Sequence, residues 1–339
     1  MTFAPMAIES TFDDAYRAAT EGALALDRSH LAIVAARGKD RESFLQNMLT
    51  NDVRSLAPGT GVPAAFLTNK GKLVSDLLVF KSDDVFLLQL ERERAEDFRK
   101  ALDRYIISED VALESRAETE ASFSLEGPEA SGILAELAGL SMSALDELAH
   151  LHFRSLDLSA VPARITAQRR ELTPRFDVTA SRAFAPALLE RVLERGAILG
   201  GESVRETRRI EASRPRFGVD MDESHLPLEA GLDEAISFQK GCYIGQEYVV
   251  RLAHRGHVNR KLSGLKLAGA EAPAPGSPVL HGAEEAGAVT SAAFSPAFGG
   301  TLALAFLKRA YLEPGTEVTV CGATATVSPL PFARSALCG

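Results

Sequence analysis

The sequence predicts an α+β protein with antiparallel sheets, followed by a β-barrel at the C-terminal end. Before residue 250, short strand-like runs are interspersed with segments of helical spacing, which is the order expected of an α+β layer. After residue 260, short apolar runs are separated by glycine and proline, which is typical of a small all-β domain. At 339 residues the chain is also too long for one ordinary core, so we expect more than one domain.

The first predicted layer starts with an apolar run that reads as a buried strand, residues 31–36. Asp40 follows where a helix N-cap belongs, ahead of apolar residues at helical spacing. Asn69 and Gly71 then mark a turn between two strands. The remaining elements of this layer are strands 62–67, 73–80 and 84–90, helix 91–103 and strand 110–114.

The second predicted layer continues the same alternation and is followed by the barrel. Its elements are strand 122–126, helix 129–138, strands 151–157, 162–167 and 175–179, and helices 183–196 and 202–212. The expected barrel strands are 286–294, 301–306, 316–320 and 323–327. We therefore expect two interlocked α+β subdomains over residues 1–255 and a β-barrel domain over residues 260–335.

Charged segments near residue 210 are expected to be solvated. Helix 202–212 is rich in arginine, and a charged helix is more often a solvated face than a site, so we place Arg205 and Arg208 at the surface. Asp220, Asp222 and Glu223 likewise read as a surface acidic run without the spacing of a calcium loop.

Composition and charge narrow the class of protein. A hydrophobic content of 46% with 24% charged residues is ordinary for a soluble globular protein. No apolar run reaches the roughly 18–20 residues of a membrane span, and the N-terminal segment lacks the pattern of a secretory or mitochondrial leader. Cys242, Cys321 and Cys338 are widely spaced, so we expect a reducing cytoplasm and no self-contained metal site. A net charge of −9 disfavours nonspecific nucleic-acid binding.

The stretch from Lys240 to Glu247, KGCYIGQE, gathers a thiol, a cation, an amide, a carboxylate and two glycines. Lys240 lies two residues from Cys242, and a nearby cation stabilises a thiolate. If Gly241 opened a helix, its N-terminus would add to this effect, and Gln246 would share a helix face with Cys242. A buried structural cysteine is the alternative, since free cysteines are often buried. The polar neighbours favour a reactive thiol.

This stretch resembles the K-G-C-Y-x-G-Q-E signature of the YgfZ-type folate-binding proteins, and it matches at every fixed position. Those proteins are relatives of the glycine-cleavage aminomethyltransferases and are tied to iron–sulfur protein maturation. Three further segments fit the same family, namely Thr50–Val53, Arg216–Asp220 and Leu226–Leu232. The resemblance covers roughly residues 30–310 and implies a three-part, aminomethyltransferase-like folate-binding fold.

The resemblance implies tetrahydrofolate or a derivative as the cofactor. A pterin edge presents adjacent N–H donors that a carboxylate accepts, and Glu211 matches the helix carboxylate that lies by the pterin in aminomethyltransferases. Tyr243 is a candidate for the flat slot around the ring; Phe217 and Phe238 could line it too, although core packing is their expected role. Basic residues 251–261 are expected either to meet the anionic tail or to form a solvated loop. The predicted cofactor residues are Glu211, Asn69, Asp76, Tyr243, Gln246, Glu247, Arg251 and Arg260, and the predicted catalytic residues are Cys242 and Lys240.

The sequence departs from the aminomethyltransferases at one motif. Their Gly-Gly-x-x-Asp-Asp pattern supplies a carboxylate that serves their chemistry, whereas here Lys72 replaces the second glycine and Ser75 the first aspartate. A hydroxyl cannot act as a carboxylate base near neutral pH. Relatives that lack this aspartate carry the cysteine signature instead, which implies redox or sulfur chemistry at Cys242.

The expected function is therefore that of a tetrahydrofolate-binding accessory protein for assembly or repair of iron–sulfur proteins. Its expected partners are folate and the iron–sulfur assembly machinery or client enzymes, and we expect a monomer with no membrane. One alternative is a folate-dependent aminomethyl- or methyl-transferase, against which Ser75 counts. Another is an RNA-binding factor in tRNA modification acting through residues 251–261, which lack the interleaved aromatic residues that single-strand stacking needs.

Overall fold

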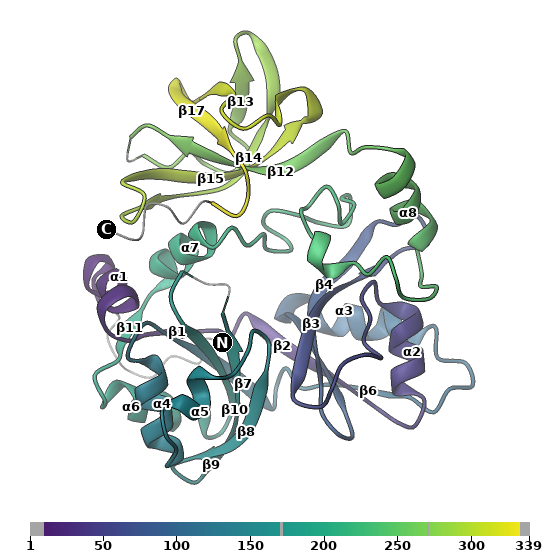
Figure 1. Cartoon of the computed structure of the whole chain (residues 1–339), viewed down its shortest axis with the longest axis vertical. Helices are drawn as coiled ribbons and strands as arrows, with labels where there is room; N and C mark the ends of the chain where they lie inside the picture. The colour runs from purple at the N-terminus through teal and green to yellow at the C-terminus, as the bar shows by residue number, and fades with distance from the viewer. Residues whose placement is uncertain (1–9, 170–171, 270, 333–339) are drawn as a thin grey trace. The chain divides into compact units, whose positions relative to one another are not determined.

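The computed structural model describes residues 10–169, 172–269 and 271–332 (Figure 1). The chain divides into two compact units. The first unit comprises the residues up to Phe66 together with Ser75–Val204 and Gln239–Tyr243, and the second comprises Leu67–Val74, Arg205–Phe238 and the chain from Ile244 onward. Among the described residues, no helix is long and apolar enough to cross a membrane.

A five-stranded sheet in the order β3-β4-β5-β2-β6 forms one layer of the first unit. Its central strand β2 pairs antiparallel with both β5 and β6, so the predicted antiparallel arrangement is confirmed. Each element expected here is present: β2 (Leu31–Arg37), α2 (Arg41–Met48), β3 (Thr60–Leu67), β4 (Leu73–Lys81), β5 (Phe86–Glu91), α3 (Arg92–Asp103) and β6 (Ala112–Ser115). Asp40 is the N-cap residue of α2, as predicted, but its side chain makes no capping hydrogen bond, and its Oδ2 accepts instead from the backbone N–H of Asp110 at 2.8 Å.

A six-stranded sheet in the order β11-β1-β7-β10-β9-β8 forms the other layer. Its strands are β1 (Leu24–Asp27), β7 (Glu120–Glu126), β8 (Phe153–Leu158), β9 (Val161–Gln168), β10 (Arg175–Ser181) and β11 (Ile198–Gly200). Strands β1 and β11 run parallel, while β1·β7, β7·β10, β10·β9 and β9·β8 are antiparallel. The accompanying helices are α1 (Phe12–Glu21), α4 (Ala130–Ala138), α5 (Ser143–Asp146) and α6 (Ala185–Leu193). Elements α1, β1, α5 and β11 have no counterpart in the sequence prediction.

The six-stranded sheet has one apolar face and one polar face. Phe123, Ile165 and Phe176 alternate along their strands and share a core with apolar residues of α4 and α6. The intervening positions carry polar side chains that are nevertheless buried, among them Arg164 and Thr179. Since successive strand residues point to opposite faces, the alternation places a buried polar layer on the face away from these helices.

The second unit contains a closed barrel of six strands in the order β12-β15-β14-β13-β16-β17, which confirms the predicted C-terminal barrel. The strands are β12 (Arg260–Leu267), β13 (Pro278–His281), β14 (Glu284–Ser295), β15 (Gly300–Lys308), β16 (Glu317–Val320) and β17 (Ala323–Ser328). Strands β12 and β13 were missing from the sequence prediction. Two helices complete the ordered elements used below, α7 (Glu202–Glu211), whose residues from Arg205 onward belong to this unit, and α8 (Gln246–Arg255).

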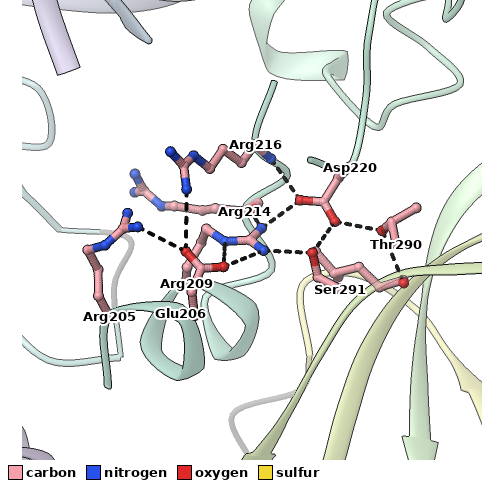
Figure 2. A network of polar contacts seen from close by, with 9 residues as sticks. Arg205, Glu206, Arg209, Arg214, Arg216, Asp220, Thr290 and Ser291 are labelled. Carbon is pink, nitrogen blue, oxygen red and sulfur yellow. Dashed lines mark hydrogen bonds and ion pairs between the residues drawn. The ribbon is translucent and has the colours of Figure 1, made fainter. Parts of the chain in front are cut away.

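A buried polar network ties α7 to the barrel, with Asp220 at its centre (Figure 2). Asp220 is 2% exposed, and its Oδ2 accepts from Arg209 Nη1 at 2.7 Å and from the backbone N–H of Arg216 at 2.9 Å. Its Oδ1 accepts from the hydroxyls of Thr290 and Ser291 on β14, each at 2.6 Å. The expectation of a surface position for Asp220 is therefore wrong, because four donors compensate for its loss of solvent.

Replacing Asp220 by alanine should unfold the protein much more readily than replacing its exposed neighbour Asp222. The Asp220→Ala variant leaves Arg209 without one of its buried carboxylate partners, and breaking a buried pair costs about 3–5 kcal/mol of unfolding free energy. Asp222→Ala removes an exposed carboxylate and should cost about 1 kcal/mol or less. Urea unfolding of both variants measures the difference, and equal transition midpoints would contradict the assignment.

Candidate functional site

Lys240 is held in the first unit against the loop that follows α2. Its ammonium donates to the backbone carbonyl oxygens of Gln46, Leu49 and Asn51, the last two at 2.6 and 2.9 Å. Burial lowers the pKa of Lys240 to about 8. Lys240, the cation expected to act on Cys242, therefore also has a structural role, because it binds three backbone carbonyl groups.

The Thr50–Val53 segment, which includes one of the carbonyl groups that Lys240 binds, is itself held by hydrogen bonds. The hydroxyl of Thr50 accepts from the backbone N–H of Ala65 at 2.8 Å, and Asn51 Nδ2 donates to the carbonyl of Pro63 at 2.7 Å. Gln46 Nε2 donates to Asp52 Oδ1 at 2.9 Å, while Gln46 Oε1 accepts from the backbone N–H of Val53 at 3.0 Å. Two segments that resemble the same family, 189 residues apart at Asn51 and Lys240, thus contact each other. Sequence reasoning missed Gln46, since no motif marks it.

Cys242 lies in a loop and is exposed, as a reactive thiol would be. The expectation that Gly241 opens a helix is wrong, because α8 begins at Gln246 with Gly245 as its N-cap. Gln246 therefore does not share a helix face with Cys242. Cys321 is exposed as well, and Cys338 lies outside the described residues.

The two glycines of the signature have different roles. Gly245 has φ +80°, and a Cβ there would lie 2.5 Å from the carbonyl oxygen of Thr68, so only glycine fits. A Cβ on Gly241 would meet nothing within 4 Å. Gly245 thus serves the fold, whereas Gly241 leaves open space next to Cys242.

Tyr243 is 7% exposed, and its hydroxyl has no hydrogen-bond partner within the described part of the chain. Lys240 Nζ lies 5.3 Å from the centre of its ring. Burial raises the pKa of Tyr243 to about 12, so the phenol keeps its proton at neutral pH. A buried hydroxyl without a partner is uncommon, because it forfeits the hydrogen bond it had with water.

Asp76 and Ser75 stand next to each other on β4. Ser75 is 1% exposed, and its hydroxyl donates to the backbone carbonyl of Asp76 at 2.8 Å. The β4·β5 register pairs Leu78 with Gln89, and continuing it by two residues places Asp76 opposite Glu91. Burial raises the pKa of Asp76 to about 7, and the charge of Glu91 acts in the same direction. The carboxyl is consequently half-ionised near neutral pH. Sequence reasoning missed Glu91, which only the strand register reveals.

Glu211 ends α7 in the second unit and is 1% exposed. Its Oε2 accepts from Arg208 Nη1 at 2.9 Å, and its Oε1 accepts from the hydroxyl of Ser295. Arg205 and Arg208 are themselves buried, so the expectation of a solvated arginine face is wrong. Their charges are paired inside the unit, Arg205 with Glu206 at 3.4 Å and Arg208 with Glu211.

The turn at Asn69 packs against the start of α8 within the second unit. The backbone N–H of Gly71 donates to the carbonyl of Thr68 at 2.9 Å, which closes the turn and leaves Asn69 exposed. A Cβ on Gly71 would lie 2.8 Å from the Cβ of Tyr248, whose ring stacks under the guanidinium of Arg251 at 4.8 Å.

The remaining candidates of the second unit differ in their surroundings. Gln246 is half-buried and Glu247 exposed in the first turn of α8. Arg260 lies on β12, 5.2 Å from the ring centre of Phe306 and 3.9 Å from Glu229. Phe217 is buried, as core packing predicts, but Phe238 is 43% exposed and is not a core residue.

The predicted site residues fall into both units. Asp76, Lys240, Cys242 and Tyr243 belong to the first unit, and Asn69, Glu211, Gln246, Glu247, Arg251 and Arg260 belong to the second. No group of three His, Cys, Asp or Glu side chains suited to a metal ion is found in the described ranges. The functional groups that these residues offer are the carboxyl of Asp76, which titrates near neutral pH, the protonated phenol of Tyr243, the exposed thiol of Cys242, and cationic side chains.

Comparison with known proteins identifies the family. Residues 2–240 match the family described as "GCVT N-terminal domain", and residues 260–333 match "Glycine cleavage T-protein C-terminal barrel domain". An aminomethyltransferase of Rubrobacter xylanophilus is 33% identical over 91% of this chain and 82% of its own length. An aminomethyltransferase of Caldanaerobacter subterraneus is 29% identical over 93% and 85%. The crystal structure of the glycine cleavage system aminomethyltransferase T from Bartonella henselae shares the fold, with a TM-score of 0.86 at 23% identity over 95% of this chain and 90% of that one. This chain therefore belongs to the glycine cleavage T-protein family.

Proposed function

We propose that this protein binds a reduced folate, tetrahydrofolate or a derivative, and that it transfers a one-carbon group such as an aminomethyl or methyl group. The similarity to aminomethyltransferases over nearly the whole chain supports this function. The observation that carries it is the carboxyl of Asp76. Its pKa of about 7 suits a group that accepts and returns a proton at neutral pH, which Ser75 cannot do.

The residues present suit a folate. The hydroxyl of Tyr243 is a buried donor that still lacks a partner among the described residues, so a polar atom of a ligand would satisfy it. Glu211, Arg251 and Arg260 of the second unit are separate candidates, Glu211 for the pterin edge and the two arginines for the anionic tail, and Glu211 is tested below. A bound folate would carry the one-carbon group, while the protein orients it and moves protons at Asp76.

Stability should report the raised pKa of Asp76. The folded protein holds this proton up to about pH 7, whereas an unperturbed aspartate releases it near 3.8. Between those values the folded state binds more protons, so the contribution of this group to the free energy of unfolding falls as the pH rises. Asp76→Asn removes the titration and should be more stable than the wild type at pH 8 but equal to it near pH 4.

Urea unfolding across that pH range measures this difference, with Asp97→Asn on the exposed side of α3 as the matched control. A variant Asp76→Asn that is no more stable than the wild type at pH 8 would show that the carboxyl has an ordinary pKa.

Folate binding should depend on the charge of Glu211. Loss of a charged hydrogen-bonding partner costs about 1.5–3 kcal/mol, so Glu211→Gln should weaken tetrahydrofolate binding by roughly tenfold or more. Calorimetric titration measures the affinity, and Glu223→Gln, which changes an exposed carboxylate, is the control. Unchanged affinity in Glu211→Gln removes this residue from the site, and no binding to the wild type overturns the proposed function.

A second candidate function is favoured by Cys242 and Ser75. In this proposal the protein is a YgfZ-type accessory factor for assembly or repair of iron–sulfur proteins, with the exposed thiol as its reactive group and the assembly machinery or client enzymes as partners. Two observations support it: Ser75 replaces the aspartate of the aminomethyltransferase pattern, and Gly241 leaves open space beside Cys242. Turnover with the partner proteins of glycine cleavage distinguishes the two candidates.

The accessory function predicts that Cys242 is the preferred target of alkylating reagents. Both Cys242 and Cys321 are exposed, so exposure alone gives them comparable rates, and a faster reaction at Cys242 would show activation. Bound tetrahydrofolate should slow that reaction, and Cys242→Ser should fold normally but fail to support iron–sulfur client enzymes. Mass spectrometry gives both rates, and equal rates would make Cys242 an ordinary surface thiol.

A further inference from the structure

A cavity of about 430 Å³ lies within the first unit and is lined by both of its sheets. Arg37 and Leu87 contribute from the five-stranded sheet, while Ser155, Arg164 and Thr179 contribute from the six-stranded sheet. Its volume falls within the usual range for small-molecule sites. None of the residues assigned above to folate or to the reactive thiol lines it.

A row of polar side chains crosses the six-stranded sheet at this cavity. The strand registers pair Ser155 with Arg164, Arg164 with Thr179, and Thr179 with Ser122. Arg164 Nη2 donates to the hydroxyl of Thr179 at 3.3 Å, and the hydroxyls of Thr179 and Ser122 are 2.9 Å apart. At the cavity, this row presents the guanidinium of Arg164 flanked by hydroxyl groups.

Arg164 is buried and forms no ion pair with the described part of the chain, although the charges of Glu120 and Asp177 act on it from nearby. It is 8% exposed, its Nε has no hydrogen-bond partner, and no ion pair of this guanidinium exists among the residues that the structure describes. The rings of Phe80 and Phe153 lie 5.6 and 5.9 Å from it, which offsets part of the cost of burial. Burial lowers the pKa of Arg164, and the charges of Glu120 and Asp177 offset only part of that effect, because neither carboxylate forms an ion pair with it.

The other two arginines of the cavity are already paired. Arg116 Nη1 donates to Glu120 Oε1 at 2.7 Å, and Arg37 Nη1 donates to Asp84 Oδ2 at 2.7 Å. Arg164 is therefore the arginine of the cavity lining that forms no ion pair within the described chain, although the charge of Glu120 acts on it from the same lining. An anion from solution would complete its hydrogen bonds and neutralise it.

We propose that this cavity binds a compact oxyanion, the phosphate or carboxylate group of a small metabolite, with Arg164 as its charged contact and the hydroxyls of Ser155 and Thr179 beside it. The guanidinium offers a planar set of donors that matches both phosphate and carboxylate oxygens. This site is separate from the proposed folate site, and the two proposals stand or fall independently.

The test titrates the full-length protein with inorganic phosphate and, separately, with malonate. Isothermal calorimetry gives the affinity, and NMR of the arginine Nε–H signals shows whether Arg164 responds. We expect saturable binding that Arg164→Met weakens about tenfold or more, since a charge-assisted contact is lost. Arg154→Met is the matched control: it changes an exposed arginine that precedes Ser155 on β8, does not line the cavity, and should leave binding unchanged.

A second variant covers the case in which Arg164→Met does not fold. Ser155→Phe keeps Arg164 but fills the cavity from an exposed strand position, and it should also abolish binding. Binding of phosphate alone identifies a phosphoryl ligand, and binding of malonate alone identifies a carboxylate. Failure of both probes to bind the wild type overturns the proposal, as does wild-type affinity in a folded Arg164→Met or Ser155→Phe variant. Tetrahydrofolate binding, measured in parallel, should be the same in all of these proteins.

Discussion

The ammonium of Lys240, bound to three backbone carbonyl oxygens, is the contact on which the signature segment of the first unit depends. Hydrogen bonds to a charged donor are stronger than neutral ones, and here they join Gln239–Tyr243 to a loop nearly 200 residues earlier in the chain. The hydrogen bonds of Gln46, Thr50 and Asn51 hold that loop in the shape that offers its carbonyls. Cys242 and Tyr243 come two and three residues after Lys240 in the chain, so the hydrogen bonds of Lys240 also fix their positions.

Buried charge is handled in two different ways in this protein. Asp220 is almost inaccessible, but donors meet both oxygens of its carboxylate. Such groups stabilise one arrangement, because losing any partner leaves an uncompensated charge. Asp76 and Arg164 are less fully compensated. Asp76 faces the like charge of Glu91, and Arg164 donates to one hydroxyl beside aromatic rings, while the carboxylates that act on it, Glu120 and Asp177, form no ion pair with it. Buried charges that lack a full set of partners are typical of catalytic and ligand-binding sites.

Strand alternation explains how one sheet serves both stability and binding. In β9, Ile165 and Ala167 pack into the apolar core, while Arg164 and Thr166 point to the opposite face. The same alternation in β7 and β10 assembles hydroxyls and charges into rows that no single strand contains. Polar residues at these positions are costly to bury singly, but across strands some of them hydrogen-bond one another, as Gln168 does with Asp177 and Arg164 with Thr179.

Periodicity and turn residues in the sequence were enough to determine most strands and helices, the antiparallel sheets and the C-terminal barrel, because these depend on local hydrophobic spacing. The motif at residues 240–247 was sufficient to identify the broad family and to predict an exposed Cys242. Short elements such as β1, β11 and β13 were missed, since three or four residues carry little periodic signal. Tertiary structure alone decided that Lys240 binds carbonyls, that helix α8 begins only at Gln246, that Asp220 and Arg208 are buried, and that Glu91 faces Asp76. Each of these features depends on residues that are distant in the sequence. Those neighbours, and not the residue type, determine whether a charged side chain is solvated, which partner it has and what its pKa is.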